Sequence, residues 1–159
     1  MMAEGHPWCY VATSTVGYPI DVMNKTRKGL NFRGAAFMQV YAPCQKGFVY
    51  QTPLTIELGK MVVECGLFPV WEYDPEARRY EYFIPEQQHL VVEYLKLQGR
   101  FGHLTAEHIA KIQASANRKW EMIGAEVPQD FRDADDPEYY VSRGIGEAGA
   151  AASERAKAW

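Results

Sequence analysis

Cysteine is scarce in this chain of 159 residues. The three cysteines, Cys9, Cys44 and Cys65, are widely spaced, and the sequence contains no CxxC pair. An odd number of cysteines at such spacings argues against a disulfide framework. Free cysteines are typical of a reducing compartment, so we expect a cytoplasmic protein.

Long apolar runs and an excess of positive charge are also missing. No stretch approaches the roughly 20 apolar residues that a membrane helix needs. The first ten residues, MMAEGHPWCY, show no basic region followed by an apolar run, so we expect neither a secretory signal nor a membrane partner. The formal net charge of -3 argues against a nucleic-acid-binding surface, which is normally basic.

Common catalytic and nucleotide-binding motifs are absent as well. The sequence contains no GxxxxGK[ST], GxSxG or HExxH. His103 and His108 are five residues apart, which is not the spacing that places two metal ligands on one helical face. We therefore interpret both histidines as surface or packing residues.

The hydrophobic pattern predicts an α/β protein. The run at residues 35–42, AAFMQVYA, is almost entirely apolar, which is typical of a parallel strand covered on both faces. The basic residues from 25 to 28 are expected to form the solvated end of a helix. The predicted elements are a strand at 9–13, a helix at 19–30, a strand at 35–42, a helix at 52–66, a hairpin of strands at 68–73 and 79–84, and helices at 86–98 and 105–123.

Three regions follow from this order. Residues 1–73 are expected to form a partial α/β domain with a parallel sheet, and residues 74–125 the second hairpin strand with a helical extension. Residues 126–159 are acidic and then rich in small residues, so we expect a tail that is mobile or becomes ordered on a partner. With only two strands of parallel character, the chain resembles the back part of an α/β domain.

Binding sites in open α/β sheets form outside the carboxyl ends of the parallel strands. Here these are residues 13–17 and residues 41–47, and the second segment contains Cys44. A thiolate at that position could act as a nucleophile or a metal ligand. The alternative is an inert, partly buried loop thiol. Cys9 lies in a predicted strand and Cys65 on an apolar helix face, so both are expected to be core residues.

Several segments together resemble a known family. YVATSTVGYP, FMQVYAPCQKGF, TIELGKMVVECGLFPVWEYDP and VEYLKLQGRF occur in the order found in the thiamine-diphosphate-binding β subunit of 2-oxoacid:ferredoxin oxidoreductases. Pyruvate:ferredoxin oxidoreductase is the best-known member. The similarity covers about residues 5–115 and corresponds to the C-terminal part of that subunit.

The resemblance implies a definite chemistry. These enzymes decarboxylate a 2-oxoacid on thiamine diphosphate and Mg²⁺, transfer the acyl group to coenzyme A, and pass electrons through [4Fe-4S] clusters to ferredoxin. In the family, the fourth cysteine of the cluster nearest the thiamine lies in a YAPC-type loop. On this sequence that ligand is Cys44. Thr13, Ser14 and Thr15 are expected to line the cofactor site.

The sequence departs from the family where the main cofactor motifs would be. The Gly-Asp-Gly segment that leads to the Mg²⁺-binding Asn is absent, and so are the other three cluster cysteines. The chain alone is therefore expected to bind neither thiamine diphosphate nor a complete cluster. A partner chain that supplies both, as in a split subunit, is one explanation, and a truncated fragment is another.

Two functional hypotheses remain open on the sequence, besides a decayed open reading frame that folds poorly. The first is a component of a 2-oxoacid oxidoreductase that is inactive alone and works with the other subunits. The second is a non-catalytic assembly or regulatory module derived from the same fold. Both predict a protein partner, because a half-sheet leaves a strand edge unpaired.

Overall fold

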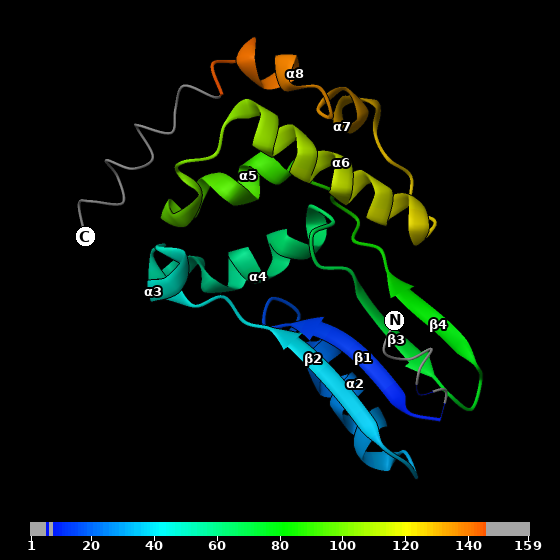
Figure 1. Cartoon of the computed structure of the whole chain (residues 1–159). Coiled ribbons are helices and arrows are strands. Elements are labelled where there is room, and N and C mark those ends of the chain that lie inside the picture. The colour runs from blue at the N-terminus through cyan, green and yellow to red at the C-terminus, as the bar shows by residue number, and fades with distance from the viewer. Residues whose placement is uncertain (1–5, 7, 146–159) are drawn as a thin grey trace.

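The computed structural model describes His6 and residues 8–145. Four strands form one mixed sheet in the order β2-β1-β3-β4 (Figure 1). β1 and β2 are parallel, while β3 runs antiparallel to both β1 and β4. The strands are β1 (Tyr10–Thr15), β2 (Ala36–Tyr41), β3 (Val70–Asp74) and β4 (Arg79–Phe83). The expected α/β class is confirmed, and the sheet is parallel only between its first two strands.

The helices lie in two places. α2 (Pro19–Asn31) packs behind β1 and β2, while the other helices stack beyond the carboxyl ends of these strands (Figure 1). Within the described part of the chain, no helix is both long and apolar enough to span a bilayer. The remaining helices are α3 (Gln45–Phe48), η1 (Thr52–Leu54), α4 (Thr55–Glu64), α5 (Val91–Lys96), η2 (Gly99–Phe101), α6 (Ala106–Met122), α7 (Gln129–Asp133) and α8 (Pro137–Val141).

The apolar strand β2 is not covered on both faces, contrary to the sequence prediction. It lies at the edge of the sheet, where Phe37 and Val40 remain 45% and 40% exposed. The fully buried strand is β1, because it lies between β2 and β3. An apolar run therefore identified a strand correctly but not its position in the sheet.

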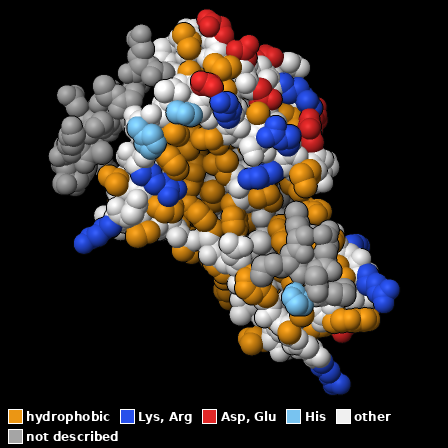
Figure 2. Space-filling model, in the orientation of Figure 1, with side chains coloured by type: hydrophobic (Ala, Val, Ile, Leu, Met, Phe, Trp, Pro, Cys, Tyr) orange, Lys and Arg blue, Asp and Glu red, His pale blue; other side chains and the backbone are white. Residues whose placement is uncertain are grey.

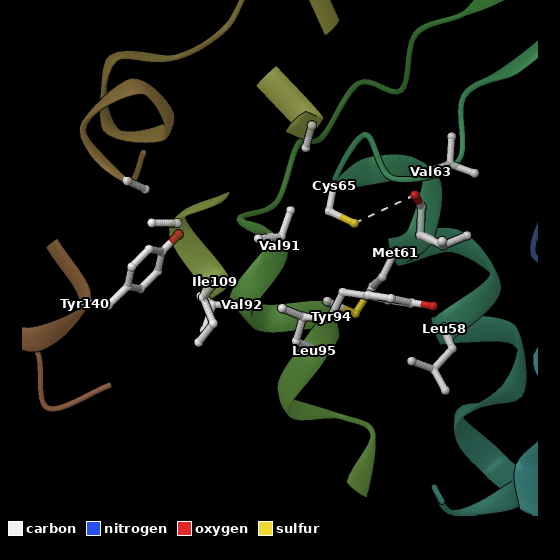
Figure 3. Close-up of a cluster of buried hydrophobic side chains, with 14 of the residues drawn as sticks. Leu58, Met61, Val63, Cys65, Val91, Val92, Tyr94, Leu95, Ile109 and Tyr140 are labelled. Carbon is white, nitrogen blue, oxygen red and sulfur yellow. Dashed lines mark hydrogen bonds between the residues drawn. The ribbon is translucent and has the colours of Figure 1, made fainter. Parts of the chain in front are cut away.

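The main hydrophobic core lies between α4, α5 and α6 and reaches the sheet at Val70 of β3. Leu58, Met61 and Cys65 from the α4 region belong to one buried cluster with side chains of α5 such as Val91. Tyr140 lies on the opposite side of α5 from α4 (Figure 3). Burial raises the pKa of the Cys65 thiol to about 12, so this cysteine is a core residue as expected. The expected helix at 86–98 begins only at Val91, whose backbone N–H donates to the buried Gln113 side chain.

The first part of the expected mobile tail is folded. α7 and α8 pack on α6, because Phe131, Ala134 and Tyr140 supply buried apolar side chains that the acidic composition obscured. Acidic side chains cover the outer surface of this region (Figure 2). Residues 146–159 lie outside the described part of the chain, and the division into three regions stays a prediction.

Gly66 allows α4 to end directly against α6. Its φ is +73°, and a Cβ at this position would lie 2.6 Å from Nε1 of Trp120. Gly124 ends α6 with a similar φ of +76°, but no atom lies within 4 Å of its hypothetical Cβ. The two glycines therefore differ in packing but not in backbone conformation.

This pair predicts two different stability losses. Gly124→Ala should lower the free energy of unfolding by about 1 kcal/mol, which is the left-handed backbone cost. Gly66→Ala should lower it by about 2 to 4 kcal/mol, since overpacking adds to the same cost. Urea unfolding followed by circular dichroism measures both, and equal losses would contradict the role given to the Trp120 contact.

Candidate functional site

The two loops expected to form a site do lie side by side. β1 and β2 are parallel, so their carboxyl ends meet at the same edge of the sheet (Figure 1). The backbone N–H of Val16, just after β1, donates to the carbonyl of Tyr41 at the end of β2 over 3.0 Å. The two loops differ, however, in whether their polar side chains are exposed to solvent.

The hydroxyl groups at the end of β1 donate hydrogen bonds to other groups of this chain. Thr13 donates to the carbonyl of Pro69 over 2.9 Å, and Thr15 donates to the carbonyl of Gly59 over 2.8 Å. Ser14 donates to the carboxylate of Asp21 over 2.5 Å. All three residues are buried. Their expected role in lining a cofactor stays a prediction, and the structure gives their hydroxyls other partners.

A close contact between two glycines closes the loop after β1. A Cβ on Gly17 would lie 2.4 Å from the backbone of Gly59 on α4, and a Cβ on Gly59 would lie 2.7 Å from the nitrogen of Gly17. Neither position has room for a side chain. The backbone of α4 therefore covers this strand end and joins the sheet to the helical layer.

The loop after β2 is anchored but open. The hydroxyl of Tyr41 lies 2.5 Å from that of Tyr94 on α5, and burial raises the pKa of both phenols. Two residues further on, the carbonyl of Pro43 accepts a hydrogen bond from the buried Tyr50 over 2.9 Å. These contacts fix the backbone just before Cys44.

The thiol of Cys44 is exposed at this anchored position, unlike the buried Cys65 and the half-buried Cys9. It directly precedes α3, whose Phe48 ring lies 3.3 Å below the guanidinium of Arg100. Cys44 is therefore the most exposed of the three cysteines. As a thiolate it could bind a soft metal centre or act as a nucleophile.

Cys44 cannot form a metal site with its neighbours alone. Within the described residues, no group of three or more His, Cys, Asp or Glu side chains is placed to hold an ion. Cys44 can therefore offer one thiolate ligand, and the remaining ligands would have to come from outside the described residues. His103 and His108 do not pair, and His108 instead completes the cap of α6 with Thr105.

Sequence reasoning missed the polar contacts beneath α2. Lys25, predicted to be solvated, is 5% exposed. Its ammonium donates to the carbonyl of Thr13 and to the carboxylate of Asp21, each over 2.9 Å. The Asp21–Lys25 spacing of four residues, which suits a helical ion pair, was the available signal. The pair holds α2 to the strand end that carries Ser14.

A second polar group lies along the same side of α2. The buried Glu72 on β3 accepts hydrogen bonds from Tyr10 on β1 and from Lys28 on α2. Burial raises the pKa of the Glu72 carboxyl, but the hydrogen bonds from Lys28 and Tyr10 outweigh it, so the pKa is lowered from 4.5. Glu81 faces Glu72 across the hairpin and forms an ion pair with Arg79.

Comparison with known proteins identifies relatives of one kind. The chain is 42% identical to the pyruvate synthase subunit PorB of Methanocaldococcus jannaschii over 124 residues. It is 36% identical to the ketoisovalerate oxidoreductase subunit VorB of Pyrococcus abyssi over 117 residues, and 33% identical to PorB of Thermotoga maritima over 127 residues. No protein-family model matches the chain. The resemblance inferred from the sequence segments is thus confirmed.

The matches cover most of this chain but a minor part of each relative. They include 78%, 72% and 77% of this chain, respectively. The same matches include 41%, 37% and 39% of the relatives. The chain therefore spans about two fifths of the length of these subunits.

The lowered pKa of Glu72 predicts a pH-dependent stability. A lowered folded-state pKa stabilises the fold above the unfolded value of about 4.5, and this contribution is lost as the pH falls through the folded value. Glu72→Gln should lower the free energy of unfolding by about 1.5 to 3 kcal/mol at pH 7, the range for hydrogen bonds to charged groups. The difference should shrink below pH 4.

The exposed Glu57 on α4 offers a matched control. Glu57→Gln should change the free energy of unfolding by less than about 0.5 kcal/mol. Urea titrations of the three proteins between pH 3 and 7 give the comparison. A Glu72→Gln effect that stays constant over this range would show that the carboxylate charge is not what stabilises the sheet.

Proposed function

Since this chain is a relative of the B subunits of pyruvate synthase and ketoisovalerate oxidoreductase, we propose that it is a component of a 2-oxoacid:ferredoxin oxidoreductase. In this proposal the chain forms the C-terminal part of a thiamine-diphosphate-binding β subunit. The complete enzyme oxidatively decarboxylates a 2-oxoacid, with coenzyme A as acyl acceptor and ferredoxin as electron acceptor. The chain is inactive until the rest of the subunit is present.

The exposed thiol of Cys44 carries the proposal. We assign it as one ligand of a [4Fe-4S] cluster, which conducts electrons one at a time when bound. A ligand that completes a cluster held mainly by another segment must be exposed and fixed in position. Cys44 is exposed, and the contacts of Tyr41 and Pro43 fix the backbone beside it.

The remaining cofactor groups are proposed to come from outside this sequence. The Gly-Asp-Gly motif and the other three cluster cysteines are absent here. The hydroxyl groups at the end of β1 already donate hydrogen bonds within the fold, so they do not fit as donors to thiamine diphosphate. These are the hydroxyls of Thr13, Ser14 and Thr15. Their proposed contribution is to shape the strand end beside the cofactor, whose Mg²⁺ and diphosphate are bound elsewhere.

Replacement of Cys44 tests the proposal in the assembled enzyme. Cys44→Ala should remove or alter the electron paramagnetic resonance signal of one reduced cluster, because the cluster loses one of its four cysteine ligands. If the whole cluster is lost, the iron content should fall by about four atoms per complex. Cys9→Ala is the control, because Cys9 is also a free and incompletely buried cysteine. It should leave the signal and the iron content unchanged.

An unchanged spectrum and iron content in Cys44→Ala would remove the ligand assignment. If the wild-type complex also lacked iron in stoichiometric amounts, the chain would instead be a non-catalytic module derived from this fold. Circular dichroism of both variants checks that each remains folded.

A further inference from the structure

The helix α2 packs with its polar side inward and its apolar side outward. Its only fully buried residue is Lys25. Ile20, Met23 and Leu30 are 67%, 66% and 81% exposed. Their spacing of three and seven residues places them along one stripe, on the side opposite Asp21 and Lys25. A helix against a sheet normally buries such a stripe, so this arrangement indicates a second covering layer.

The polar inward side is specifically bonded. Lys25 and Asp21 bind each other and the end of β1, and Lys28 binds Glu72 on β3. Turning the helix to bury its apolar stripe would break these contacts and expose a buried carboxylate. The outward stripe is therefore a fixed feature of the fold.

The neighbouring strand edge is open in the same region. Among the described residues, β2 pairs only with β1, and Phe37 and Val40 on β2 are partly exposed. Thr26 on α2 contacts Met38 on β2, so helix and edge strand adjoin. A further segment that adds a strand to this edge and a helix over α2 would cover both features, since parallel strands are joined by crossover connections that are usually helices.

We infer that the apolar stripe of α2 (Ile20, Met23 and Leu30) and the outer edge of β2 together form the docking surface for the rest of the β subunit. This inference rests on the proposed function and adds the place of contact. The occupant is the segment homologous to the part of PorB that this chain does not match, about three fifths of that protein. It docks whether it is carried on this polypeptide or on another.

The chemistry of the stripe specifies the occupant further. Arg27 lies within the stripe, is exposed, and has a single long contact of 3.5 Å to the side chain of Asn24. The covering segment should therefore present apolar side chains around one carboxylate that pairs with Arg27. The same stripe on a second copy of this chain contains no carboxylate to pair with Arg27.

Site-specific photocrosslinking tests the docking surface. The protein is expressed in its native cells, together with any further segment or chain that completes the subunit. A benzoyl-phenylalanine is introduced at Met23 on the stripe, or at Met122 on α6 as the control. The two methionines are 66% and 70% exposed. Mass spectrometry then identifies the crosslinked peptides. Position 23 should crosslink to the segment homologous to the unmatched part of PorB, at least tenfold more than position 122 does.

Each other outcome overturns the inference. A crosslink from position 23 to a second copy of this chain or to an unrelated protein would assign the surface to a different occupant. If the PorB-like segment copurifies but position 23 does not crosslink to it, the docking surface is wrong while the proposed function stands. If no such segment is associated with the chain, the proposed function fails as well.

Discussion

The structure depends on the ion pair between Asp21 and Lys25 beneath α2. Lys25 lies almost entirely out of water, where an unpaired charge is costly, so its ammonium must find partners within the fold. Asp21 and the carbonyl of Thr13 provide them, and Ser14 completes the group. This contact sets the rotation of α2 about its axis, and with it the side of the helix that faces the sheet.

The same contact lies next to the ends of the two parallel strands. The chain passes from β1 through α2, which Lys25 holds to the end of β1, into the parallel strand β2, so both strand ends meet at one edge. One strand end is covered by α4 and the other presents Cys44 on an anchored loop. An open thiol beside a closed strand end suits a ligand for a group held by another segment. Catalysis within this chain alone would need further groups at the same edge.

Much of the fold could be predicted from the sequence, because local signals were strong. Pro19 and Gly66 mark helix ends, and the turn after Asp74 joins β3 to β4 as expected. The errors have a common cause, since burial depends on tertiary neighbours. An apolar run does not reveal that β2 lies at the edge, and a basic cluster does not reveal that Lys25 is buried. Cys44 lies in the loop after β2, where the strand pattern predicted it, and its role as a ligand stays a prediction. The internal partners of Thr13, Ser14 and Thr15 arise from packing with α2, α4 and β3.

The contact between Gly17 and Gly59 has a consequence for how genetic data on this protein are interpreted. Both glycines lie beside the candidate site, and neither can accept even a methyl group without moving a backbone. In a mutational screen for the proposed function, substitutions at either position would abolish that function by separating two layers of the fold. Such variants would cluster beside the candidate site although their defect is in folding. A parallel measurement of protein abundance would distinguish them from variants that damage the site itself.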